Sequence, residues 1–206
     1  DISGNQIVGI SSLDALVNLK KLNLSSNRIS KIENLSGLRS LEELRIFNNM
    51  ISTLDGLNNL NKLNYLNAGI NRITRIEGLD QLENLGFLAL YENNLTRIEG
   101  LENLKKIYAL FLSENQITRI EGIAHLSGLL LLQLQQNRIT KIENLEHCPL
   151  LNDINLGKNQ ISVIEGIAHL DNLTRLDLEA NPVKDISMLS SHTRLRYLGL
   201  SRTKVK

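Results

Sequence analysis

The sequence of 206 residues contains no tryptophan, only four tyrosines and three phenylalanines, two prolines and one cysteine. A single cysteine excludes an internal disulfide framework and favours a reducing compartment. No apolar run approaches the roughly 18 residues that span a membrane, so we expect no membrane insertion. Lys and Arg total 23 against 22 Asp and Glu, and this balance argues against nucleic acid or an anionic membrane as partner.

What the sequence does contain is an internal repeat of 22 residues without insertion or deletion. From Asn27 on, leucine or isoleucine stands eight and five residues before each repeated asparagine, and nearly always again two, five, eight and eleven residues after it. Such regularity predicts one coiled unit stacked about nine times, each unit burying its apolar edge on its neighbours. The repeated asparagines define position 0 of each unit: Asn5, Asn27, Asn49, Asn71, Asn93, Asn115, Asn137, Asn159 and Asn181, with Thr203 in the tenth place.

The pattern inside a unit predicts its local structure. Apolar residues alternate from position −5 to −3, as in Leu22-Asn23-Leu24, which indicates a short strand. They recur every third residue from position +2, which is the period of a 3₁₀-like turn. Position +7 holds glycine or asparagine, so we expect a left-handed backbone there. The position 0 amide is expected to bond backbone groups that the following bend leaves unpaired.

The string Leu-x-x-Leu-x-Leu-x-x-Asn-x-Ile-x-x-Ile-x-x-Leu, complete from Leu129 to Leu145, resembles leucine-rich repeats. The repeat length resembles the short-repeat subclass that includes the leucine-rich regulatory subunit of type-one protein phosphatase and, more distantly, the internalins. The resemblance implies an α/β solenoid: a curved right-handed array with a parallel concave β-sheet and a 3₁₀ or irregular convex side. We expect one domain over residues 1–206, a fragment without caps, whose open ends allow self-association.

The sequence carries no motif for catalysis, a cofactor or a metal. Four histidines, His125, His147, His169 and His192, fall at one rim of the convex segment, where we expect structural roles. Cys148 replaces a core leucine and is predicted to be a small buried residue. We therefore expect a protein that is not an enzyme and that has no cofactor.

Two charge rows follow the repeat. We interpret them as a neutralising surface ladder, not as a phosphate-binding stripe, because basic position +4 lies two residues from acidic position +6. The basic row comprises Arg28, Lys31, Arg72, Arg75, Arg97, Arg119, Arg138 and Lys141, and the acidic row comprises Glu33, Asp55, Glu77, Glu99, Glu121, Glu143 and Glu165.

Most aromatic residues occupy strand positions that face away from the predicted core. Adjacent strands lie ~4.8 Å apart, so these side chains should form one concave patch, and a large exposed apolar area generally marks an interaction site. Strand preference is the alternative explanation, with the rings covering one another. The predicted binding residues are Phe47, Tyr65, Ile70, Phe87, Tyr91, Phe111 and Leu131, with charged residues Arg45, Asp153, Arg175, Asp177 and Glu179 around them.

The sequence thus predicts an interaction module that binds a protein partner on its concave face. A phosphatase-regulatory or scaffold role in the cytoplasm is one version. The alternative is a secreted or surface receptor or adhesin of the internalin type, whose eukaryotic form would carry glycans on the sequons at Asn23, Asn34, Asn94 and Asn172.

Overall fold

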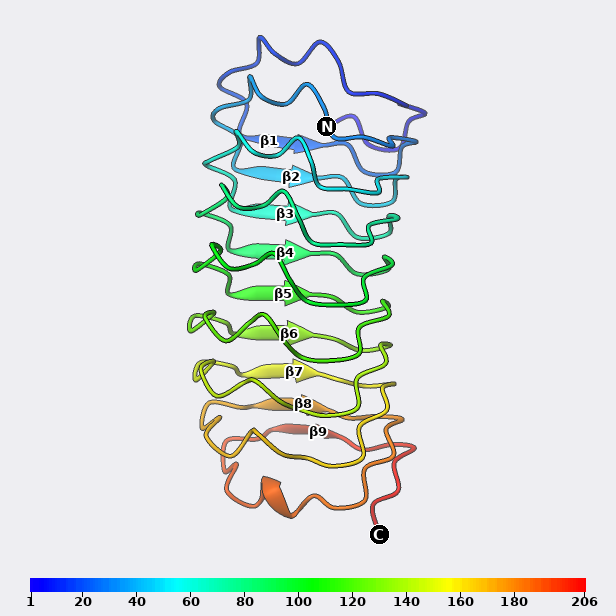
Figure 1. Cartoon of the computed structure of the whole chain (residues 1–206), viewed down its shortest axis with the longest axis vertical. Helices are drawn as coiled ribbons and strands as arrows, with labels where there is room; N and C mark the ends of the chain where they lie inside the picture. Colours follow the sequence, from blue (N-terminus) through cyan, green and yellow to red (C-terminus); the bar gives the residue numbers. More distant parts are fainter.

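The computed structural model describes all residues from 1 to 206 and shows a stack of coils joined by one parallel sheet (Figure 1). The sheet has nine strands in sequence order, and each strand has three residues. The strands are β1 (Lys21–Asn23), β2 (Glu43–Arg45), β3 (Tyr65–Asn67), β4 (Phe87–Ala89), β5 (Ala109–Phe111), β6 (Leu131–Gln133), β7 (Asp153–Asn155), β8 (Arg175–Asp177) and β9 (Tyr197–Gly199).

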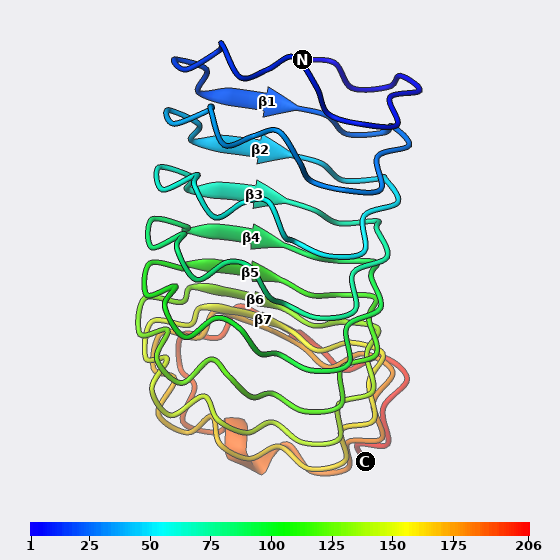
Figure 2. The same ribbon diagram turned by 45° about the horizontal axis from the view of Figure 1, so that its top comes forward.

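The strand register follows the sequence repeat without slippage. Each residue pairs with the residue 22 positions later, as in Leu44 with Leu66 and Leu66 with Leu88. The strands are evenly spaced in Figure 1, whereas in the tilted view of Figure 2 their spacing shrinks from β4 to β7 while the opposite segments stay spread. The array is therefore curved, and the sheet lines its inner side.

One apolar core runs the length of the stack. The central residue of every strand from β1 to β8 is buried, while both of its strand neighbours belong to the other face. Because the turn segments also contribute a buried leucine or isoleucine every third residue, 53 buried residues form a single hydrophobic cluster. The coils therefore share one core and constitute one solenoid.

The helical part of the expected α/β fold is not confirmed, and most of the convex side is irregular, which the expectation had allowed. The only helix is the 3₁₀ element η1 (Ser187–Leu189). Elsewhere the three-residue period produces separate turns: the Leu38 N–H donates to the Leu35 carbonyl and the Leu41 N–H donates to the Leu38 carbonyl. Each turn closes one i to i+3 bond, and the short coil bends back before a helix can continue.

The left-handed backbone at position +7 is confirmed, with φ between 57° and 95° at both asparagines and all five glycines of that row. A second left-handed position directly precedes the asparagine in every coil, and the sequence did not reveal it. That row includes Asn48, Glu92, Lys158 and even Ile70, and φ lies between 51° and 57° at all its non-glycine members. Its side chains are varied, so composition gave no signal.

The repeated asparagine joins adjacent coils, as Asn115 illustrates. Its Oδ1 accepts from the Leu95 N–H at 2.9 Å, and its Nδ2 donates to the Leu90 carbonyl at 3.0 Å, both in the preceding coil. The same Nδ2 also donates to the Leu112 carbonyl in its own coil at 3.1 Å. These bonds recur from Asn27 to Asn181, which confirms the predicted role of the buried amide.

Three of the four histidines and the cysteine have structural positions. His125, His169 and His192 each place Nε2 within 3.0 Å of a carbonyl oxygen of the preceding coil, whereas His147 is exposed. Cys148 is fully buried, and burial raises the pKa of its thiol to about 11. Cys148 is thus a core residue, as its place in the repeat predicted.

Apolar side chains are exposed in the first coil, where Val8 is 65% and Val17 is 49% accessible. In the last coil Leu198, Leu200 and Val205 are half-buried. Self-association through these edges stays a prediction. No helix in the structure has the length and apolarity needed to cross a membrane.

Asn115→Ala is expected to lower the free energy of unfolding by about 3 kcal/mol, because it leaves buried backbone groups of two coils without partners. Asn5→Ala is the matched control, since exposed Asn5 bonds only Ile2 and Ser3 of its own coil. Urea unfolding followed by circular dichroism measures both. Equal losses in the two variants would contradict the bridging role.

Cys148 is expected to resist iodoacetamide at pH 8 in the folded protein, since the thiol is buried and stays protonated far below a pKa of about 11. Alkylation should become complete when urea unfolds the chain, as measured by intact mass. Rapid labelling of the native protein would show that this part of the core opens readily.

Candidate functional site: the concave sheet face

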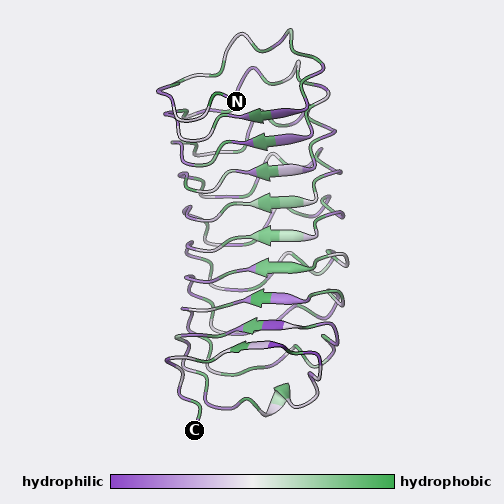
Figure 3. Ribbon diagram, turned by 180° about the vertical axis from the view of Figure 1, so that it is seen from behind, coloured by the Kyte–Doolittle hydropathy of each residue, from purple (hydrophilic) through white to green (hydrophobic).

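The first and third residues of each strand project from the concave face of the sheet, on either side of a buried leucine or isoleucine. Parallel in-register pairing places equivalent residues side by side along the stack. The central strands are hydrophobic, while β7 and β8 begin or end on polar residues (Figure 3). The face therefore has an apolar centre between two polar regions.

The rings at the centre are stacked. Tyr65 and Phe87 lie parallel, with ring centroids 4.2 Å apart and an interplanar angle of 6°. Phe87 and Phe111 lie 5.0 Å apart across the diagonal, tilted by 34°. The register pairs Phe87 with Ala109 and Ala89 with Phe111, so each ring faces a small residue. Both alanines are buried without belonging to the core cluster, because the rings cover them.

A second pair of aromatic residues lies just beyond the strands, at position −2. The Tyr91 ring lies against Gly69 of the preceding coil, where an added Cβ would be 2.5 Å from ring carbon Cζ. Phe47 occupies the same position one coil further back, and half-buried Ile70 follows Gly69. Gly69 thus gives the Tyr91 ring its place, which the sequence pattern did not indicate.

The predicted patch exists, but its side chains are less free than expected. Phe47, Tyr65, Phe87, Tyr91 and Phe111 are all half-buried, as are Ile70 and Leu131. Mutual covering of the rings, the alternative explanation, therefore also holds. Removing a central ring will cost some stability as well as any binding, because stacked pairs contribute about 0.5–1.5 kcal/mol beyond buried area.

Charged residues on the β1–β2 side are paired with one another. Glu43 lies 3.0 Å from Lys21 Nζ and 2.7 Å from Arg45 Nε. The hydrogen bond from Lys21, together with the positive charges, lowers the pKa of the Glu43 carboxyl. The Arg45 guanidinium also lies 5.4 Å from the centre of the Tyr65 ring, which connects this region to the aromatic centre.

The β7–β9 side has a second network around Arg175. Its guanidinium lies 3.2 Å from Asp177 Oδ2, 3.8 Å from Asp153 Oδ1 and 3.7 Å from the centre of the Tyr197 ring. The Tyr197 hydroxyl donates a hydrogen bond to Asp177 Oδ2 at 3.3 Å. Half-buried Glu179 donates its backbone N–H to the Asp177 carboxylate at 3.0 Å. The network keeps a surplus of negative charge, because it contains one guanidinium and the carboxylates of Asp153, Asp177 and Glu179.

The convex charge rows form a ladder, but between coils rather than within one coil. Arg97 pairs with Glu121 at 3.0 Å, and Arg119 pairs with Glu143 at 3.0 Å. Arg75–Glu99 and Lys141–Glu165 repeat the arrangement one coil before and one coil after. Stacking brings position +6 of the next coil within reach of position +4. The remaining members Arg28, Lys31, Arg72 and Arg138 form no ion pair.

Family models agree with this architecture. A model described as leucine-rich repeats (2 copies) matches residues 1–37, and one described as leucine-rich repeat matches residues 131–183. Together with the solved structures below, these matches support the leucine-rich repeat family; the phosphatase-regulator subclass is not confirmed. None of the curated proteins matches this sequence.

Solved structures of other proteins have a similar fold. Internalin InlF from Listeria monocytogenes has a TM-score of 0.93 and 32% identity, covering 98% of this chain and 60% of its own. Internalin C2 of the same species has a TM-score of 0.87 and 28% identity, and the match covers 91% of this chain and 84% of internalin C2. The plant peptide hormone receptor RGFR1, in complex with RGF2, has a TM-score of 0.77 and 27% identity. The match covers 93% of this chain and 33% of RGFR1. The chain thus spans about 60% of InlF.

Ile70→Asn is expected to raise the free energy of unfolding by about 1 kcal/mol, because a β-branched residue is disfavoured at its φ of 52° and asparagine tolerates it. Glu92→Asn, at φ 51° in the same row of the next coil, is the control and should gain less. Thermal unfolding compares the two. A loss in Ile70→Asn would mean that apolar packing of Ile70 outweighs its backbone strain.

Proposed function

We propose that this chain is a non-enzymatic interaction module that binds a protein partner on the concave face, with Tyr65, Phe87, Tyr91 and Phe111 as anchors. The observation that carries this proposal is a stacked aromatic cluster on the solvent side of the sheet, where the core does not require it. Large aromatic side chains at the centre of a face commonly supply most of the binding energy of an interface.

The geometry suits binding in two further respects. The rings already restrict one another in the free protein, so a partner loses little side-chain entropy by fixing them. The charges on both sides are paired internally, at 2.7 Å for Glu43–Arg45 and 3.2 Å for Arg175–Asp177. They therefore form a polar boundary that favours specificity around an apolar centre.

The similarity to the internalins supports the extracellular or surface version of this function, which is the alternative to the cytoplasmic location. RGFR1 is a receptor in complex with a peptide hormone, and it supports the use of this fold for binding a polypeptide. A regulatory or scaffold role beside a phosphatase would use the same face and stays a prediction.

Phe111→Ala and Tyr91→Ala are each expected to weaken partner binding by about 2 kcal/mol, roughly thirtyfold, because each removes a central anchor. Binding is measured by capture from native extract followed by titration of the captured protein. Arg119→Ala is the control, since Arg119 is exposed on the convex side and pairs only with Glu143. Circular dichroism, recorded well below the melting point, shows whether each variant is folded.

The opposite result would assign binding elsewhere. If both alanine variants keep the partner at wild-type affinity while Arg72→Ala loses it, the aromatic cluster takes no part in binding. The unpaired members of the basic row would then be the binding surface.

A further inference from the structure

A second apolar surface lies beside the concave face, on the rim where the chain enters strands β5 to β7. It is formed by Tyr108, which is 45% exposed, Leu150, which is 46% exposed, and half-buried Leu130. Leu130 precedes Leu131 of the concave patch directly, so the two surfaces are continuous along the chain. We call these three residues the entry-rim patch. Their exposure is not explained by the core.

Gly128 makes a gap in this patch. Its row lies nine residues before each asparagine, and side chains of that row contact their neighbours along the stack: Lys106 Nζ bonds Asn84 Oδ1 at 2.6 Å, and Arg194 bonds Asn172 Oδ1 at 2.8 Å. Between Lys106 and Leu150 the row has only Gly128, and an added Cβ there would meet nothing within 4 Å. The backbone is not left-handed at this glycine, so its conformation does not require glycine.

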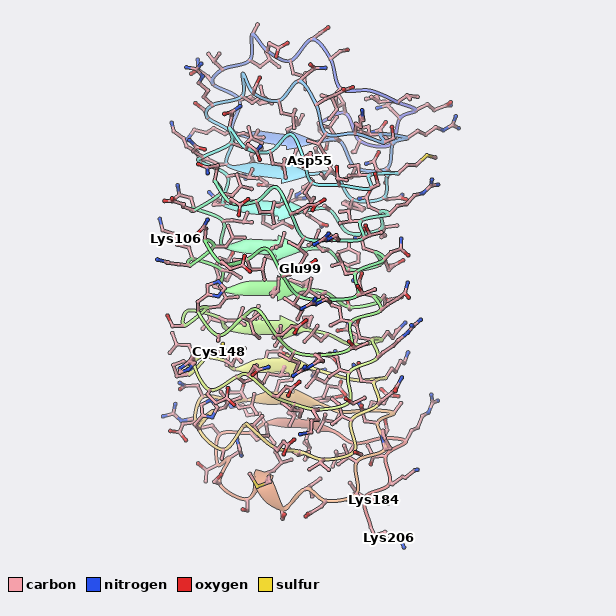
Figure 4. The ribbon with its side chains drawn as sticks, in the orientation of Figure 1. Asp55, Glu99, Lys106, Cys148, Lys184 and Lys206 are labelled. Carbon is pink, nitrogen blue, oxygen red and sulfur yellow. The ribbon has the colours of Figure 1, made fainter.

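Two lysines lie in the coil before the gap. Lys105 and Lys106 are exposed and take part in no ion pair of the structure. Lys106 Nζ bonds the neutral amide of Asn84 in the coil before it, and Glu83 lines the same surface hollow as the two lysines without pairing with either. Lys106 lies at the edge of the stack where the chain enters the sheet (Figure 4). The charge of this lysine is therefore available to a carboxylate from outside.

We propose that the entry-rim patch is a second contact surface for the partner polypeptide, which places a bulky apolar side chain in the gap at Gly128 and an Asp or Glu against Lys105 and Lys106. This inference rests on the proposed function in that one partner spans both surfaces, from Phe111 through Leu131 and Leu130 to the rim. Apolar anchors beside complementary charge are the usual composition of such a contact.

A phage-displayed library of random 16-residue peptides, selected on the wild-type protein, tests this inference. The blocking variant is Gly128→Glu, which places a negatively charged side chain in the gap; its Cβ meets nothing within 4 Å. Ser40→Glu, in the same row away from the patch, is the matched control, and Phe111→Ala reports on the concave face. Binding of each enriched peptide is measured by fluorescence anisotropy.

The expected result is a peptide class with an acidic residue next to a large apolar one, bound at least about tenfold more weakly by Gly128→Glu and unchanged by Ser40→Glu. Peptides that lose affinity for Phe111→Ala alone would overturn the rim contact and leave the proposed function standing. Peptides that bind all variants equally would contradict both, and no enrichment above an unrelated protein would overturn the rim contact.

Discussion

Each buried asparagine side chain bonds the backbone of two successive coils, and the rest of the structure depends on that link. In Asn93, Oδ1 accepts from the Ile73 N–H at 2.9 Å, while Nδ2 donates to the Ala68 carbonyl at 3.1 Å. Three-residue strands alone give little pairing between coils. The amide adds bonds at the bend after the strand, where the backbone would otherwise be unsatisfied. It thereby fixes the 22-residue register that every other row follows.

That register explains why the fold could be predicted well from sequence. The leucine rows, the asparagines and the glycines at position +7 each have a chemical requirement that repeats in every coil, so their meaning is visible without a structure. The helical part of the predicted fold is not confirmed, because a period of three fits both a 3₁₀ helix and separate turns. The left-handed residue before each asparagine stayed hidden, since residues as different as Glu92, Ile70 and Asn48 occupy it.

The candidate site was predictable only in outline. Alternation showed which residues face away from the core, but not that Tyr65 stacks on Phe87 or that Phe111 covers Ala89. Those contacts depend on side-chain direction, and so does the Tyr91 ring over Gly69. The entry-rim patch was missed because its positions vary in type from coil to coil. Only the exposure of Tyr108 and Leu150 in the structure reveals it.

In a solenoid of this kind, the residues that stabilise the fold differ from those that are exposed on the concave face. The core and the asparagine bonds need the leucine, isoleucine and asparagine rows, and they leave the concave residues free to vary. Ile70 keeps a strained backbone next to the aromatic cluster, and the rings remain at the surface although polar residues serve the same positions elsewhere in the stack. We therefore attribute the backbone strain at Ile70 to the proposed binding role rather than to folding.

Fluorine NMR of the protein labelled with 3-fluorotyrosine tests this central claim most directly, because the chain has only four tyrosines. Tyrosine-to-phenylalanine variants assign the signals of Tyr65, Tyr91, Tyr108 and Tyr197. When the purified partner is added, we expect the Tyr65 and Tyr91 signals to shift or broaden in proportion to occupancy. A partner that binds and leaves both of these signals unchanged would contradict binding on the concave face.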